Sequence, residues 1–155
     1  MLDTDTFANI VKNTPLISID LLVFDRENKL LLGWRVNSPA KNTWFVPGGR
    51  ITKDETIHQA FKRISKVELG KEMDISEGKF LGVYEHIYPN ENFGDIPDFS
   101  THYIVLGFRI DIDHENFKLP HTQHNNYKWL PDSEVLKAEN VHQNVKNYLN
   151  GYVLF

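Results

Sequence analysis

The segment from Gly48 to Gly70 combines residue types and spacing that suit the binding of a phosphate group. Gly48 and Gly49 stand before a stretch with helical periodicity, and glycine allows the backbone to approach a ligand closely. The start of a helix favours anions because of its free amides and its dipole. The pair therefore predicts a cradle for a diphosphate, with a plain turn as the alternative interpretation.

Glu68 is the carboxylate of this segment that lies nearest the expected core. Apolar residues recur every three or four positions before it, which predicts one buried helix face: Ile57, Ala60, Phe61, Ile64 and Val67. At 100° per residue, Glu68 falls within about 45° of the centre of that face. A carboxylate removed from water requires a compensating charge, so this position predicts a bound cation. The alternative is that Glu68 lies in the last turn and reaches solvent.

The elements that must position these residues form an α+β layered domain. Thr52 and Glu55 have the spacing of a capping box, and Gly70 is a natural helix end. Pro47-Gly48-Gly49 is expected to break regular pairing after a short strand. Helices are predicted at 3–12, 52–70 and 133–149, the last with a break near 139–140, and strands at 17–24, 30–36, 43–46, 80–88, 102–112 and 127–130.

Length and composition limit the class of protein. A chain of 155 residues suits one domain spanning 1–155, and 41% hydrophobic with 25% charged residues is ordinary for a globular protein. A net charge of −4 argues against broad capture of nucleic acid, and no apolar run is long enough to span a membrane. The absence of cysteine excludes a thiol nucleophile. With no secretion signal in its first residues, a cytoplasmic location is expected.

The spacing across this segment resembles the Nudix box. Matching residues are Gly49, Glu55, Arg63, Glu68 and Gly70. The sequence departs from the box where Ile64 and Val67 replace glutamates and Ser65 replaces an apolar residue. Fewer carboxylates remain to bind cations, so the departure argues against the two or three metals that ordinary family members use.

The rest of the chain resembles one branch of the Nudix superfamily, the GDP-mannose mannosyl hydrolases. The similar segments cover nearly the whole length: 13–16 (NTPL), 44–50 (WFVPGGR), 98–103 (DFSTHY), 119–120 (LP), 123–124 (QH) and 140–142 (NVH). This resemblance implies a Nudix-type α/β/α sandwich with a mixed central sheet. It also implies a homodimer and a role in cell-surface polysaccharide metabolism.

The resemblance implies one Mg²⁺ per subunit, with Mn²⁺ as a substitute. The ligands carried over are the Glu68 carboxylate, the Gly48 carbonyl and the Gln123 side-chain oxygen, which suit a hard cation. Without the resemblance, Gln123 would be interpreted as a solvent-facing loop amide.

The resemblance also assigns residues to the substrate. Arg35 and Arg50 correspond to partners of the diphosphate, which a guanidinium recognises with two parallel hydrogen bonds. Asp20 matches a nucleotide-binding position and Tyr103 a phosphate contact. From placement alone, the arginines could equally be surface residues and Tyr103 a packed strand residue.

His124 resembles the family's general base, since an imidazole accepts a proton from water near neutral pH. His86 matches a position near the sugar. Glu55 and Arg63 are expected to pair and to brace the loop against the helix.

The implied reaction is hydrolysis of a GDP-sugar. Water activated by His124 attacks the anomeric carbon and GDP departs, so GDP-mannose or GDP-glucose gives GDP and a free sugar with inversion. A conventional Nudix pyrophosphatase that produces GMP and sugar 1-phosphate is the first alternative. The second is a non-catalytic nucleotide-sugar-binding domain, which the missing glutamates at Ile64 and Val67 would suit.

Overall fold

A single mixed sheet forms the centre of the computed structural model, which describes residues 1–120 and 126–155. Within these residues the sheet has seven strands, with β3-β2-β1-β6-β5 as the main order, β4 paired to β1 and β7 paired to β2. The strands are β1 (Leu16–Phe24), β2 (Lys29–Trp34), β3 (Trp44–Phe45), β4 (Gly48–Arg50), β5 (Lys79–Tyr88), β6 (Thr101–Asp111) and β7 (Tyr127–Pro131). β1 and β6 run parallel and the other pairs are antiparallel.

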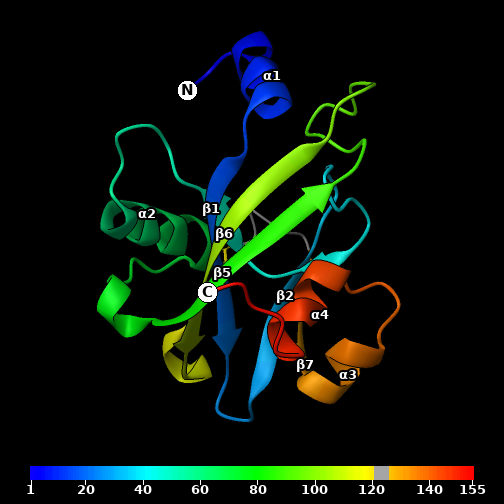
Figure 1. The fold of residues 1–155 in the computed structure, drawn as a ribbon. Coiled ribbons are helices and arrows are strands. Elements are labelled where there is room, and N and C mark those ends of the chain that lie inside the picture. The colour runs from blue at the N-terminus through cyan, green and yellow to red at the C-terminus, as the bar shows by residue number, and fades with distance from the viewer. Residues whose placement is uncertain (121–125) are drawn as a thin grey trace.

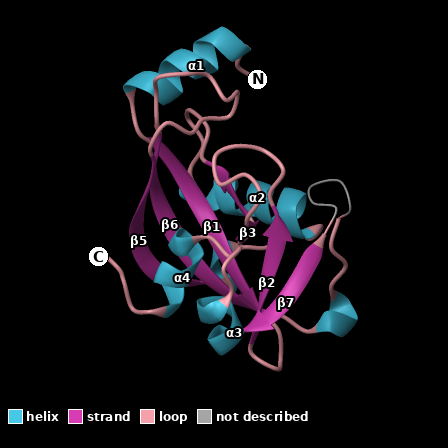
Figure 2. Cartoon of the chain, turned by 90° about the vertical axis from the view of Figure 1, so that its right-hand side faces the viewer, coloured by secondary structure: helices cyan, strands magenta, loops and turns pink. Residues whose placement is uncertain are grey.

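Helices cover both faces of this sheet (Figures 1 and 2). The helices are α1 (Thr4–Asn13), α2 (Ile57–Leu69), α3 (Asp132–Lys137) and α4 (Gln143–Leu149), with the short 3₁₀ turns η1 (Ile75–Glu77) and η2 (His114–Asn116). On one face, Phe61 and Ile64 of α2 pack with Ile19 and Leu21 of β1. On the other, Val135 of α3 and Tyr148 of α4 share a core with Leu22. The expected α/β/α sandwich with a mixed sheet is confirmed.

The predicted elements are present, with three corrections around α2. The capping box forms between Thr56 and Gln59, so the helix begins at Ile57 and not near Thr52. Thr52 and Glu55 do hydrogen-bond at 3.1 Å, but within the turn before the helix. Gly70 ends the helix as predicted, in a left-handed conformation with φ of 76°.

The second correction concerns the buried face of α2. Ala60, Phe61 and Ile64 are buried as expected, but Ile57 and Val67 are 44% and 43% exposed at the two ends of the helix. Ser65 is buried instead, because its hydroxyl accepts a hydrogen bond of 2.9 Å from the Met73 amide and so needs no water.

The third correction concerns Gly48 and Gly49, which continue the sheet and do not interrupt it. They belong to β4, which pairs antiparallel with β1 so that Gly49 faces Ile19 and Gly48 faces Asp20. The chain from β4 to α2 therefore starts at a fixed place on the sheet.

α1 lies at the end of the sheet, where most of its surface is exposed (Figure 1). Val11 is its buried residue. The ring of Phe7 contacts Phe93 in the loop between β5 and β6, with centroids 4.7 Å apart. No helix within residues 1–120 and 126–155 is long and apolar enough to cross a membrane.

Candidate functional site

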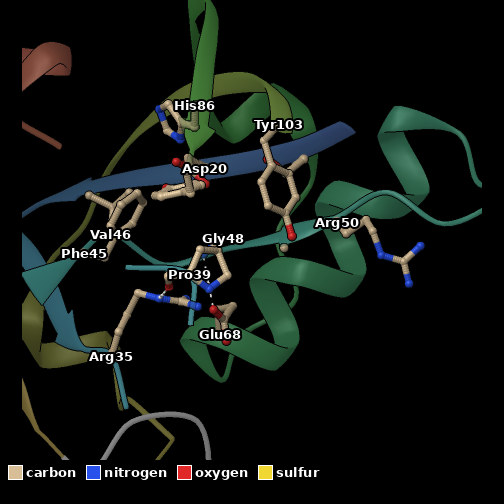
Figure 3. Close-up of a pocket in the computed structure, with 13 residues that line it drawn as sticks. Asp20, Arg35, Pro39, Phe45, Val46, Gly48, Arg50, Glu68, His86 and Tyr103 are labelled. Atoms are coloured by element: carbon tan, nitrogen blue, oxygen red, sulfur yellow. Dashed lines mark hydrogen bonds between the residues drawn. The ribbon is translucent and has the colours of Figure 1, made fainter. Parts of the chain in front are cut away.

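A cavity of about 110 Å³ opens between the sheet, the start of β4 and the end of α2. Its lining residues are Ser18, Asp20, Arg35, Pro39, Phe45, Val46, Gly48, Gly49, Arg50, Glu68, His86, Tyr88 and Tyr103. Every predicted substrate residue is therefore at this cavity, together with two of the three predicted metal ligands (Figure 3). The third predicted metal ligand, Gln123, and the predicted general base, His124, lie outside the described residues.

Gly48 lies directly opposite Asp20 and close against β1. A Cβ atom placed on it would overlap Asp20 Oδ1 and lie 2.7 Å from the Ile19 carbonyl oxygen. Any side chain at this position would therefore displace either the Asp20 carboxylate or the strand itself. Glycine is needed here for close approach, as the sequence indicated, but the neighbour is the protein's own carboxylate.

The Glu68 carboxylate contacts the Gly48 backbone at the cavity. Glu68 is half-buried near the end of α2, and its Oε1 accepts a hydrogen bond of 3.2 Å from the Gly48 amide (Figure 3). Leu21 N–H bonds the Pro47 carbonyl at 2.8 Å, so Gly48 falls between bonded pairs of the β1–β4 ladder. In an antiparallel ladder such a residue directs its amide and its carbonyl away from the partner strand.

The Glu68 carboxylate and the Gly48 carbonyl are hard oxygen donors on the same side of β4, and this donor chemistry fits Mg²⁺ or Mn²⁺. The described residues contain no cluster of three or more His, Cys, Asp or Glu residues that could hold a metal. A cation at this place would therefore take most of its remaining ligands from amide or backbone oxygens, from water or from substrate.

Arg35 is the residue that follows β2, and its side chain lines the cavity. Its Nε donates to the Pro39 carbonyl at 2.8 Å and its Nη2 to the Asn37 carbonyl at 3.4 Å. These bonds fix the guanidinium on the loop of residues 35–43 while other N–H groups remain for an anion. Arg35 is the cation that lowers the pKa of Asp20, against the stronger effect of burial.

A second loop holds the first one in place. The Ser38 hydroxyl bonds Asp95 Oδ1 at 2.6 Å, and the Ala40 amide bonds Glu91 Oε1 at 3.2 Å. Asp95 and Glu91 both belong to the loop between β5 and β6. The position of Arg35 therefore depends on two segments that are far apart in the sequence.

Arg50 lies at the rim of the cavity. It is the last residue of β4, seven positions before α2 begins, and not beside the helix start as predicted. Its guanidinium lies over the ring of Phe7, 4.9 Å from the centroid, and points away from Glu68 and Arg35 (Figure 3). Of the two described arginines that line the cavity, Arg35 is therefore the one that faces its centre.

Tyr103 extends from β6 with its hydroxyl directed toward Gly48 (Figure 3). Burial raises its pKa, and the charges of Arg35 and Arg50 lower it to a smaller extent. The phenol is consequently a neutral hydrogen-bond donor at physiological pH, suited to an anionic oxygen in the cavity.

A buried polar group adjoins the cavity and consists of Asp20, His86 and Tyr148. The Tyr148 hydroxyl donates to Asp20 Oδ2 at 2.5 Å and lies 3.4 Å from His86 Nε2. Burial raises the pKa of Asp20 to about 7, although the hydrogen bond from Tyr148 and the charge of Arg35 oppose this rise. Burial lowers the pKa of His86 to about 4, so its imidazole is neutral at pH 7.

The predicted brace between Glu55 and Arg63 forms beside the cavity. Arg63 Nε donates to Glu55 Oε2 at 2.7 Å, and Nη2 donates to Glu55 Oε1 at 2.9 Å and to the Arg50 carbonyl at 2.7 Å. The Arg63 guanidinium lowers the pKa of Glu55 to about 2. One arginine thus joins α2, the preceding turn and β4.

Sequence reasoning did not find Tyr148, Tyr88 or Phe45 as site residues. Tyr148 lies on the predicted C-terminal helix, 128 residues from its partner Asp20, and helical periodicity gives it only a core position. Phe45 stands within the WFVPGGR segment, which was a signal for the site, but its contact with His86 at 5.9 Å between ring centroids depends on the fold.

Comparison with known proteins identifies the family of this chain. The NUDIX domain family matches residues 14–150. The chain belongs to this family. Membership supports a Nudix hydrolase, and the match includes all the cavity residues.

Among sequence relatives of this Nudix chain, "Low-salt glycan biosynthesis protein Agl8" of Haloferax volcanii is 36% identical over 146 residues, covering 94% of this chain and 87% of that protein. An ADP-ribose pyrophosphatase of Methanocaldococcus jannaschii is 34% identical over 70 residues, covering 45% of this chain and 40% of that protein.

Solved Nudix structures confirm the fold. A MutT protein from Methanosarcina mazei superimposes with a TM-score of 0.69 at 20% identity, over 90% of this chain and 94% of that one. The NUDIX domain of Shewanella oneidensis NrtR, solved with ADP ribose, has a TM-score of 0.61 at 17% identity, over 97% and 98% of the two chains.

Proposed function

We propose that this Nudix protein hydrolyses a GDP-sugar, GDP-mannose or GDP-glucose, to GDP and free sugar by attack of water on the anomeric carbon with inversion. The observation that carries the proposal is the small carboxylate set of α2. Glu68 faces Gly48, whereas Ile64 is buried in the core and Val67 is exposed where the Nudix box has glutamates. One metal carboxylate suits stabilisation of a diphosphate leaving group better than activation of water against phosphorus.

The chemical layout of the cavity supports a nucleoside diphosphate joined to a polyol. Arg35 and Tyr103 supply hydrogen-bond donors to this cavity, and Asp20 and His86 supply buried acceptors. Donors suit the charged diphosphate oxygens, and acceptors suit sugar hydroxyls. The name of the Haloferax volcanii relative, which refers to glycan biosynthesis, agrees with a sugar-linked substrate.

Magnesium belongs to this proposal because its preferred ligands are present. The Glu68 carboxylate, the Gly48 carbonyl and the Gln123 amide oxygen would hold it, and it would supply positive charge to the departing diphosphate. Arg35 would donate to a terminal phosphate oxygen while its Nε remains on Pro39. Arg50 reaches the phosphates if its side chain leaves Phe7 for the cavity.

His124 is the proposed general base, and it acts on water on the side of the sugar opposite the diphosphate. Attack on that side displaces GDP and inverts the anomeric centre, so an α-linked substrate yields the β-sugar. Asp20 and His86 hold the sugar or the adjoining part of the nucleotide during this step.

Hydrolysis in oxygen-18 water tests the proposal against both alternatives. The protein is incubated with Mg²⁺ and GDP-mannose or GDP-glucose, the label is located by mass spectrometry and the first anomer is identified by NMR. We expect label in the free sugar and none in GDP. Label in GMP or sugar 1-phosphate would establish a pyrophosphatase and overturn the attack on carbon. Saturable binding without turnover would establish a binding domain.

His124→Ala tests the assigned base in the same assay. The expected result is a decrease in kcat of at least about a hundredfold, the usual size of a general-base contribution, with Mg²⁺ affinity within about twofold of wild type because His124 is not a proposed ligand. His121→Ala, three residues away, is the matched control. Near-wild-type turnover by His124→Ala would remove the residue from this role.

A further inference from the structure

We propose that Tyr148 of α4 is a positioning residue of the cavity, whose hydroxyl orients the Asp20 carboxylate and the His86 imidazole toward the polyol part of the substrate. The assignment to the polyol rests on the proposed function. The assignment of Tyr148 as the group that orients both side chains rests on geometry alone.

The ring of Tyr148 is held from several sides. Tyr148 is 8% exposed, and its ring meets Tyr84 with centroids 4.5 Å apart and an angle of 71°. A Cβ on Gly107 would come within 3.0 Å of Tyr84 Cε2 and 3.4 Å of Tyr148 Cε1. Both rings therefore pack closely on the bare backbone of β6, and the direction of the Tyr148 hydroxyl is fixed.

The hydroxyl determines which oxygen of Asp20 remains for a ligand. Oδ2 accepts the bond from Tyr148, and Oδ1 is turned toward Gly48, where it fills the space of the missing side chain. Without the Tyr148 hydroxyl, Asp20 loses the hydrogen bond that holds Oδ2, and packing of Oδ1 against Gly48 is left to orient the carboxylate.

The same hydroxyl selects the tautomer of His86. With its proton donated to Asp20, the Tyr148 oxygen is an acceptor for His86 Nε2–H at 3.4 Å. Neutral imidazole carries one proton, so a proton on Nε2 leaves Nδ1 as an acceptor. Asp20 and His86 then both present acceptors, the arrangement that recognises hydroxyl donors of a sugar.

This arrangement connects α4 to the cavity. Tyr148 belongs to the same core as Val145 of α4 and Val135 of α3. The C-terminal helices thus contribute to the site through one hydroxyl, although neither helix lines the cavity.

Tyr148→Phe removes this oxygen and preserves the packed ring. Tyr84→Phe is the matched control, because it removes a hydroxyl from the adjoining ring of the same aromatic pair. We expect Tyr148→Phe to lower kcat/KM for the GDP-sugar at least tenfold and Tyr84→Phe to stay within twofold. Both variants should retain the wild-type far-UV spectrum and unfold cooperatively.

¹⁵N NMR of the full chain shows which ring nitrogen of His86 carries the proton. A purely structural role of Tyr148 would leave this tautomer unchanged. We expect the Nε2–H tautomer in wild type and in Tyr84→Phe, and a mixture of tautomers in Tyr148→Phe. Unchanged His86 signals in Tyr148→Phe would overturn the proposal, and so would an unchanged kcat/KM in an active enzyme. If the wild type cleaves no GDP-sugar, the proposed function fails, and the His86 signals alone decide whether Tyr148 orients this group.

Discussion

Asp20 lies directly opposite Gly48 in the β1–β4 ladder, and its Oδ1 occupies the volume that a side chain at residue 48 would need. The two residues therefore form one packing unit at the centre of the cavity. Because Gly48 has no side chain, the buried Asp20 carboxylate fits against the Gly48 backbone. The amide of the same Gly48 donates to Glu68.

Gly48→Ala is expected to remove most of the activity and to lower the free energy of unfolding by about 1–3 kcal/mol, the usual cost of overpacking. The added methyl group must push Asp20 or the Ile19 carbonyl aside. Gly94→Ala is the control, because its Cβ meets only the flexible Ile96 side chain at 3.3 Å. Urea denaturation and kcat/KM measure both effects, and a fully active Gly48→Ala protein would contradict the close approach.

Glu68→Gln is expected to weaken Mn²⁺ or Mg²⁺ binding at least tenfold, because an amide oxygen replaces the carboxylate oxygen that accepts from the Gly48 amide. The amide oxygen still accepts from the Gly48 N–H, so the unfolding free energy should change by less than about 1 kcal/mol. Electron paramagnetic resonance of Mn²⁺ measures the affinity. Glu72→Gln, an exposed residue just beyond α2, controls for the loss of charge; equal metal affinity in both variants would remove Glu68 as a ligand.

Glu55 should contribute stability that depends on pH. Its pKa lies at about 2 in the fold against 4.5 ordinarily, so its contribution is present above pH 4.5 and is lost as the pH falls from 4.5 toward 2. Because Arg63 is 42% exposed and solvent screens the pair, we expect the contribution to be only about 1 kcal/mol. Glu55→Gln should accordingly lose less stability than wild type between pH 5 and 3 in urea titrations. Parallel curves would show that the pair adds no stability.

Arg35→Lys should lower kcat/KM more than Arg50→Lys does. A lysine cannot both donate to the Pro39 carbonyl, as Arg35 Nε does at 2.8 Å, and keep a fork of donors for phosphate. Arg50 lies at the rim over Phe7, where a lysine preserves the charge. Steady-state kinetics should show a loss of at least tenfold for Arg35→Lys, equal to about 1.4 kcal/mol of transition-state stabilisation. A larger loss in Arg50→Lys would reverse the assigned importance of the two residues.

Much of the fold could be predicted because its signals are local. Gly70 ends α2 since only a residue tolerant of positive φ fits there, and the spacing from Ala60 to Ile64 defines the buried face. The start of α2 was misplaced because two Thr-x-x-Glu/Gln patterns follow one another, at 52–55 and 56–59. Thr56 caps the helix, whereas Thr52 closes the turn before it.

The residues of the site were found partly through spacing and partly through resemblance. The Glu55–Arg63 pair lies within α2 and the turn before it, and both residues were selected through the motif that resembles the Nudix box. The bond from Tyr148 to Asp20 joins the last helix to the first strand. No local pattern encodes that contact, because it depends on how α4 packs over β6.

The contact of Phe7 with both Arg50 and Phe93 gives the exposed first helix influence over the rim of the cavity. An engineer could alter the reach of Arg50 from residue 7 without changing any residue that lines the cavity. Substitutions in α1 can therefore change which ligands Arg50 reaches while the residues that line the cavity stay the same.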